Sequence, residues 1–178
     1  MTDDDESPLR PKETHSDESF IEYLLAEPTF LGDEQLLIIG RGILTDIGDI
    51  VDVLAIDSSE TVHVIFLPHG KAGPAALDRL IPQGAWVSEL DERGVRSIFA
   101  GYRNDFTLDE LFGSMFGCAL PKDVNHRQIL TVVAPSFDAE VFEALEDLAD
   151  RSDGLVRAVS FREFEDGEDV LVQTKRVV

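Results

Sequence analysis

Residues 50–67 read IVDVLAIDSSETVHVIFL, and this stretch decides the fold. Two β-prone segments, 50–57 and 61–67, lie on either side of the turn Ser58-Ser59-Glu60, so the pattern predicts an antiparallel hairpin. A single carboxylate, Asp52, interrupts the apolar run in the middle of the first segment. Burying a carboxylate in a sheet costs free energy unless it is paired or holds a cation, so Asp52 is a candidate site residue.

Helices and further strands are expected on both sides of this hairpin. Short apolar runs predict strands at residues 36–40 and 129–134 and a final hairpin formed by 155–164 and 170–174. Apolar residues at helical spacing predict helices at residues 20–25, 74–90, 91–101, 107–116 and 138–150. Pro82 lies inside the longest of these and predicts a kink or two shorter helices. The order predicts an α/β fold with a mixed central sheet flanked by helices.

The length of 178 residues, of which 43% are hydrophobic, suits one domain with one core. Residues 1–16 are polar and acidic and predict a disordered tail, so we expect a single domain over residues 17–178. No apolar run approaches the roughly 18–20 residues that span a bilayer, and the N-terminal residues do not resemble a signal peptide. Cys118 is the only cysteine, which excludes an internal disulfide and a cysteine-based metal cage. We therefore expect a cytoplasmic protein without a membrane partner.

Acidic residues dominate the charge of the chain. There are 36 Asp and Glu against 15 Lys and Arg, which gives a net charge of −21. Molar salt screens such self-repulsion, because the Debye length there falls to about 3 Å. This composition is typical of halophilic proteins, and we expect an archaeal source. Strong nonspecific binding of nucleic acid needs Lys and Arg, but in such an organism DNA-binding proteins are acidic too.

The order and spacing of several segments resemble the PD-(D/E)XK nuclease-like superfamily. The segments are FIEYLLAEPTFLGDEQLLIIG (20–40), TDIG (45–48), IVDVLAID (50–57), TVHVIFLPHGKA (61–72) and AWVSEL (85–90). More narrowly, they resemble the group related to the C-terminal catalytic domain of the endonuclease NucS. The segment that begins at Ile129 is similar to the one that follows the core in that group. The resemblance covers residues 17–175 and implies a restriction-endonuclease-like fold.

The resemblance also implies a metal site. Glu18, near the start of the first helix, and Asp52 stand at positions that hold Mg²⁺ or Mn²⁺ in the family. The family's E-x-K motif falls in the second strand, where this chain has Phe66 in place of the glutamate and Pro68 in place of the lysine. A phenyl ring offers no lone pair to a cation, and proline lacks both the charge and the backbone donor. Arg79 stands where the next helix usually carries a glutamine.

These departures predict a catalytically degenerate nuclease-like domain that binds nucleic acid or protein and needs no cofactor. Arg41 and Arg79 are the candidate nucleic-acid-binding residues, and the partner is DNA, RNA or a protein. The first alternative is an active nuclease that uses Mg²⁺ or Mn²⁺ at a rearranged site of Glu18, Asp52 and Lys71. The second is a structural interaction protein with no role in nucleic-acid metabolism. A homodimer formed through an edge strand is a further expectation.

Simpler interpretations stand beside these. The alternative for Asp52 is a remnant carboxylate that is solvated or paired with an arginine. The alternative for Glu18 is an acid that stabilises the first turn of a helix. His63 alternates in phase with Ile65 and Leu67, which favours a structural role. Arginines that converge near Asp52 would favour a nucleic-acid ligand, whereas scattered arginines would favour contacts with a protein.

Overall fold

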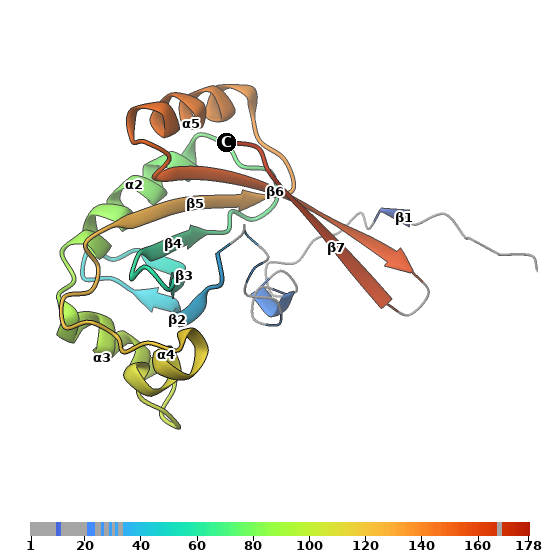
Figure 1. The fold of residues 1–178 in the computed structure, drawn as a ribbon. Helices are drawn as coiled ribbons and strands as arrows, with labels where there is room; N and C mark the ends of the chain where they lie inside the picture. Colours follow the sequence, from blue (N-terminus) through green and yellow to red (C-terminus); the bar gives the residue numbers. More distant parts are fainter. Residues whose placement is uncertain are drawn as a thin grey trace, which may run out of the picture.

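The computed structural model describes residues 10–11, 21–23, 26, 29, 31, 34–166 and 169–178. A mixed sheet with the strand order β1-β6-β5-β4-β3-β2 forms its centre, and β7 pairs with β6 (Figure 1). The strands are β1 Arg10–Pro11, β2 Leu37–Leu44, β3 Ile50–Ile56, β4 Val62–Phe66, β5 Gln128–Ala134, β6 Val156–Asp166 and β7 Asp169–Arg176. The predicted α/β fold with a mixed sheet is confirmed.

Two pairing modes meet at β4. Strands β2, β3 and β4 are antiparallel neighbours, whereas β4, β5 and β6 run parallel to one another. Because parallel strands need a crossover, the chain inserts helices between β4 and β5 and between β5 and β6. Strand β2 ends the strand order, so the sheet has the edge strand on which the expected homodimer depends. The homodimer itself stays a prediction.

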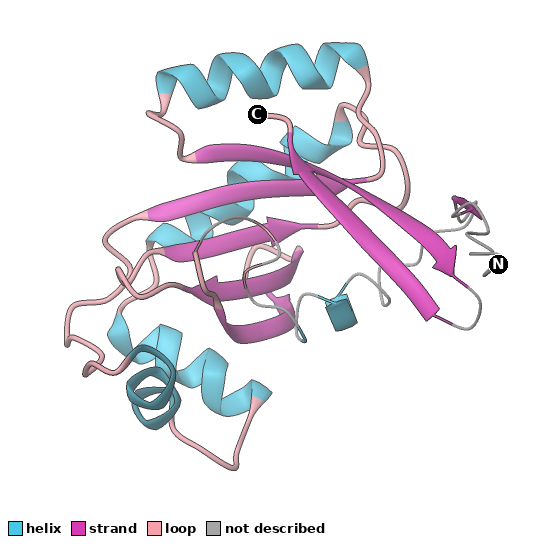
Figure 2. Cartoon of the chain, turned by 45° about the vertical axis from the view of Figure 1, so that its right-hand side comes forward, coloured by secondary structure: helices cyan, strands magenta, loops and turns pink. Residues whose placement is uncertain are grey.

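The helices cover one face of the sheet. They are α2 Ala75–Ser88, α3 Glu92–Tyr102, α4 Leu108–Phe116 and α5 Ala139–Arg151. Leu80 of α2 and Leu145 of α5 pack on Phe66, Val132 and Ala158. The helices α3 and α4 pack with α2 on the part of the same face that β2, β3 and β4 form. Figure 2 shows these helices and the sheet as separate layers. No helix among the described residues is long and apolar enough to cross a membrane.

The opposite face carries a second apolar cluster. Side chains of β3, β4, β5 and β6 contribute to it, and Leu31 and Leu36 of the segment before β2 pack against them. Of the expected tail, the structure describes only Arg10 and Pro11, which pair with β6. Of the expected first helix, residues 21–23 are helical. Glu18 lies outside the described residues.

Of the two alternatives predicted at Pro82, two shorter helices are wrong, because α2 runs as one helix through this residue. Pro82 is exposed, and a proline inside a helix removes one backbone hydrogen bond and crowds the carbonyl four residues earlier. Ala76, Leu80 and Val87 anchor both halves of α2 in the core. Packing of an apolar helix face against a sheet outweighs a local propensity of this size.

The final hairpin extends beyond the rest of the sheet. Strand β6 pairs with β5 only over Val156–Ser160, whereas it pairs with β7 over Val159–Asp166. Figures 1 and 2 show the two strands leaving the body of the molecule as an arm. One part of β6 is thus a core strand, and the remainder forms the hairpin with β7, on which β1 also pairs.

Two helical glycines test how closely α2 lies on the sheet. A Cβ at Gly84 would come within 2.7 Å of the Leu130 methyl groups, whereas a Cβ at Gly101 of α3 meets nothing within 4 Å. We expect Gly84→Val to lower the free energy of unfolding by about 1–3 kcal/mol more than Gly101→Val. Both substitutions change the intrinsic helix propensity in the same way, so the difference isolates packing. Urea denaturation measures it, and equal losses would contradict the close approach.

Candidate functional site

Asp52 lies in β3, one residue beyond the end of the pairing with β4. The register sets Leu54 opposite Val64 and ends with Val53 opposite Ile65. The Oδ2 atom of Asp52 accepts a hydrogen bond of 2.8 Å from the backbone N–H of Leu67. This bond satisfies the first backbone donor after β4 and fixes the half-buried carboxylate at the mouth of a cavity.

This cavity, which we call the Asp52 cavity, has a volume of about 420 Å³. Residues from β2, β3, α2, α3 and the segment after β4 line it together with Ile21: Arg41, Gly42, Asp52, Leu67, His69, Arg79 and Tyr102. The structure therefore brings together Asp52 and both candidate nucleic-acid-binding arginines. Two guanidinium groups, an imidazole and a phenol face the same space as one carboxylate.

Phe66, at the end of β4, contacts one of the residues that line the Asp52 cavity. Its side chain is 2% exposed, and the guanidinium carbon of Arg79 lies 4.8 Å from the centroid of its ring. A guanidinium group over an aromatic face is attracted by the ring's quadrupole. This contact helps to fix the position of Arg79, which lines the cavity together with Asp52.

A turn of the β2–β3 connection holds Arg79 in this position. Asp49 Oδ1 accepts hydrogen bonds from Nε and Nη2 of Arg79 at 3.2 and 2.9 Å. The amide of Gln83, one helical turn further along α2, donates to Asp49 Oδ2 and to the carbonyl of Ile50, both at 2.9 Å. Thr45 closes the turn, because its hydroxyl donates to the carbonyl of Asp49 at 2.9 Å. Asp49 therefore ties the sheet to α2.

The pKa of Asp49 reflects these contacts. Burial raises it, but the hydrogen bonds from Gln83 and Arg79 outweigh the burial and leave the pKa below its ordinary value. Asp49 is thus a charged partner of Arg79.

The described residues do not fit a divalent metal ion. Mg²⁺ and Mn²⁺ take several oxygen ligands, and a carboxylate pair normally supplies the anchor. No group of three or more His, Cys, Asp or Glu residues suited to a metal occurs in the part of the chain that the structure describes. At the predicted site Asp52 lines the cavity together with two arginines, while Glu18 lies outside the described residues.

Lys71 points to a different partner. Its ammonium lies 2.5 Å from Oδ1 of Asp138, the residue before α5. Two backbone bonds fasten the same loop to that region, from Ala72 N to the carbonyl of Ser136 and from Asp138 N to the carbonyl of Ala72, both 2.9 Å long. Lys71 is not among the residues that line the Asp52 cavity. The structure therefore does not bring it together with Asp52.

The other arginines are scattered. Arg96 pairs with Asp109 and Glu92, and Arg103 pairs with Asp105, away from the Asp52 cavity. Of the arginines considered in the sequence, only Arg41 and Arg79 line that cavity.

The sequence interpretation missed Tyr102, His69 and the role of Asp49. Asp49 and Arg79 are thirty positions apart, and no local pattern links them. Tyr102 reaches the cavity because it ends α3, which packs beside β2. The only signal in the sequence was that Gln83 follows Arg79 by one helical turn. Both side chains can therefore reach the same part of the connection between β2 and β3.

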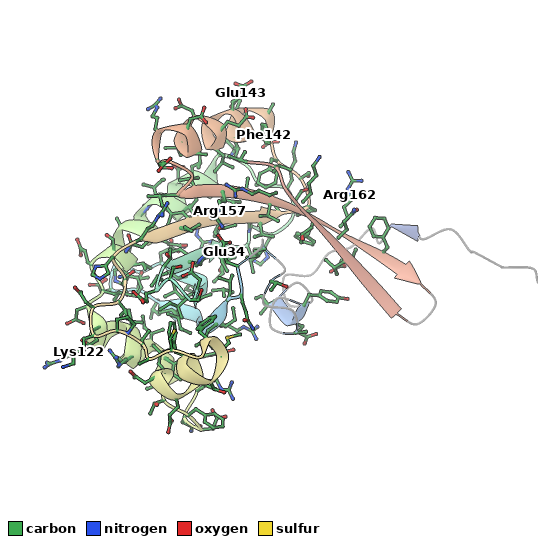
Figure 3. The ribbon with its side chains drawn as sticks, viewed as in Figure 1. Glu34, Lys122, Phe142, Glu143, Arg157 and Arg162 are labelled. Atoms are coloured by element: carbon green, nitrogen blue, oxygen red, sulfur yellow. The ribbon has the colours of Figure 1, made fainter. Side chains whose placement is uncertain are left out.

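A separate polar cluster is buried on the opposite face of the sheet. Nε2 of His63 lies 3.0 Å from Oδ2 of Asp57, and both side chains are almost fully buried. Arg157 and Glu34 form a bidentate pair nearby with two distances of 3.1 Å (Figure 3). Burial raises the pKa of Asp57, but hydrogen bonds from His63 and from the Thr61 N–H lower it below its ordinary value. These contacts support the structural interpretation of His63.

Removing the Asp49 carboxylate tests whether this turn anchors the site. We expect Asp49→Ala to lower the free energy of unfolding by about 1–3 kcal/mol, because it deprives the buried Gln83 amide and Arg79 of an acceptor. Asp46→Ala is the matched control in the same turn, and its effect should stay within about 0.5 kcal/mol.

The effect of Asp49→Ala on the free energy of unfolding should also depend on pH. Because folding lowers the pKa of Asp49, its contribution is present above the ordinary value of 3.8 and is lost as the pH falls through the lowered pKa. Urea denaturation should therefore show the gap between Asp49→Ala and the parent narrowing in that acid range. A gap that stays constant with pH would contradict the assignment.

Comparison with known proteins gives likenesses of fold. No protein-family model matches the chain, and no curated protein matches it in sequence. A solved repair endonuclease from Pyrococcus abyssi is similar at 17% identity and a TM-score of 0.46, over 76% of this chain and 45% of that one. An EndoMS–double-stranded DNA complex is similar at 16% identity and a TM-score of 0.48, over 89% and 49%. This chain thus spans just under half the length of either protein, and both are of the kind that its sequence resembles.

Proposed function

We propose that this protein is a catalytically degenerate nuclease-like domain that binds nucleic acid at the Asp52 cavity. The observation that carries the proposal is the pair formed by Phe66 and Arg79 beside Asp52. A ring and a guanidinium stand where a two-carboxylate nuclease would hold its metal ion. The arrangement offers positive charge to a phosphodiester and too few oxygen ligands to a divalent cation.

The donors that line the cavity support phosphate binding. Arg41 is exposed, and among the described residues no ion pair involves it. Guanidinium groups match the geometry of phosphate oxygens, and Tyr102 adds a hydroxyl donor. Arg79 is neutralised in part by Asp49, so Arg41 is the cation with the greatest freedom to reach a ligand.

The proposal includes the compartment and the salt concentration in which the protein works. The acidic surface, at a net charge of −21, fits a protein that works in the cytoplasm of a salt-adapted archaeon. At molar salt only charges close to a ligand act on it, so a positive site in such a chain has to be local. Measurements of function are therefore best made in about 2 M KCl, where the Debye length is below about 3 Å.

The absence of cleavage is the first expectation. Purified protein with Mg²⁺ or Mn²⁺ should leave single-stranded, flapped and mismatched DNA and RNA intact, and Asp52→Ala should behave like the parent. Gel analysis of labelled substrates measures this. Metal-dependent cleavage that Asp52→Ala abolishes would instead establish an active nuclease with a rearranged site.

The second expectation concerns binding. Replacing Arg41 by glutamine should weaken DNA binding several-fold and lower the slope of log K against log [KCl] by about one, as the loss of one phosphate contact does. Arg93→Gln is the matched control, since Arg93 is exposed on α3 and does not line the cavity. Fluorescence anisotropy over a range of KCl gives both quantities. No binding by the parent would favour a structural interaction protein.

A further inference from the structure

The β6–β7 hairpin carries a second polar cavity outside the Asp52 cavity. Ser160 lies opposite Lys175, and Arg162 lies opposite Gln173, so the four residues form two adjacent cross-strand pairs. They line a cavity of about 200 Å³, which we call the hairpin cavity. Alternation along β6 puts Ser160 and Arg162 on the same face as the buried Ala158. Figure 3 shows Arg162 on the part of the hairpin that extends beyond the body of the molecule.

All four side chains can donate hydrogen bonds. They offer a hydroxyl, a guanidinium, an amide and an ammonium group, and among the described residues no carboxylate lines the cavity. The Ser160 hydroxyl donates a hydrogen bond of 3.3 Å to the backbone carbonyl of Lys175. This contact leaves the ammonium and the guanidinium directed at the cavity. A set of donors of this kind is suited to an anion with several acceptor oxygens.

Neither cation of the hairpin cavity has a carboxylate partner among the described side chains. Among the described residues, six cations form ion pairs with carboxylates: Lys71, Arg79, Arg96, Arg103, Arg151 and Arg157. No such pair involves Arg162 or Lys175 among the described side chains, although the chain has 36 acidic residues against 15 basic ones. Diagonal neighbours on one face of a hairpin lie about 7–8 Å apart, so the two charges repel each other. A bound anion would offset that repulsion.

The hairpin cavity and the Asp52 cavity lie towards the same end of the sheet. Strands β4, β5 and β6 are parallel, with Phe66 level with Val132 and Ala134 level with Ser160. Asp52 lies on β3, three strand intervals from β6, and three intervals amount to about 14 Å. A nucleic acid strand with a rise of about 3.4 Å per nucleotide covers that distance with a few nucleotides.

We propose that the hairpin cavity binds a backbone phosphate of the nucleic acid that occupies the Asp52 cavity, an inference that rests on the proposed function. Arg162 and Lys175 contact the phosphate oxygens, and Ser160 and Gln173 add neutral donors. The hairpin then acts as an arm that holds the strand a few nucleotides away from Asp52. Such a contact adds affinity and fixes the direction of the strand without reading its sequence.

The test compares two double variants with the same change in charge. Arg162→Gln with Lys175→Gln removes the cations of the hairpin cavity, and Lys122→Gln with Arg127→Gln removes an exposed Lys and Arg from the loop before β5. Figure 3 shows Lys122 and Arg162 at opposite sides of the molecule. Binding of fluorescent single- and double-stranded DNA and of RNA is measured by anisotropy over a range of KCl. Circular dichroism confirms that each variant is folded.

The hairpin variant should bind several-fold more weakly than the parent, and its salt slope should fall by about two. The loop variant should match the parent, and the charge-conserving Arg162→Lys with Lys175→Arg should keep most of the affinity. A hairpin variant that behaves like the loop variant would overturn the inference alone, provided that Arg41→Gln still weakens binding. A parent protein that binds no nucleic acid would overturn the proposed function and this inference together.

Discussion

Strands β3 and β4 pair from Ile56 and Val62 to Val53 and Ile65, and every side chain in this run is buried. Both cores of the protein therefore begin at the same hairpin. Leu54 and Val64 contact the side covered by helices, while Val53 and Ile65 contact the side below the N-terminal segment. A one-residue slip would exchange the two sets and would turn His63 towards the helices. The same register leaves Asp52 one residue beyond the last pair of the two strands.

The candidate site depends in turn on a contact between that hairpin and a helix thirty residues away. Asp49 closes the entrance to β3, and its carboxylate receives Arg79 and Gln83 from α2. Gln83 is fully buried, so its amide cannot exchange this partner for water. These contacts fix both the rotation and the position of α2, and they place the Arg79 guanidinium over the ring of Phe66. The same contact that stabilises the layers of the fold also determines which charges face the cavity.

Local pattern was enough to predict most of the elements. The hairpin at 50–67, the helix that Thr107 begins and the strand at 129–134 each have a run of apolar residues bounded by turn or cap residues, and they occur where expected. The prediction of two shorter helices failed at Pro82, because the packing of α2 outweighed the local propensity of proline to end a helix. The sequence prediction also ended β2 near Gly40, whereas pairing with β3 carries the strand to Leu44. Both errors arose where long-range contacts outweigh local preference.

The site could be predicted only in part. Asp52 stood out because a charge in an apolar strand is visible in the sequence, and Arg41 and Arg79 were expected beside it. Tyr102 and the anchoring role of Asp49 depend on distances across the fold that no spacing encodes. Lys71 looked close to Asp52 along the chain, yet the loop that carries it is bonded to the start of α5.

The guanidinium of Arg79 over the ring of Phe66 limits what a carboxylate at position 66 could do. Asp49 and the carbonyl of Ile50 already hold this guanidinium in place. A glutamate at position 66 would be introduced beside it and would form an ion pair with it, so a cation would meet a neutralised carboxylate. Position 66 therefore cannot supply a free carboxylate ligand unless position 79 changes as well.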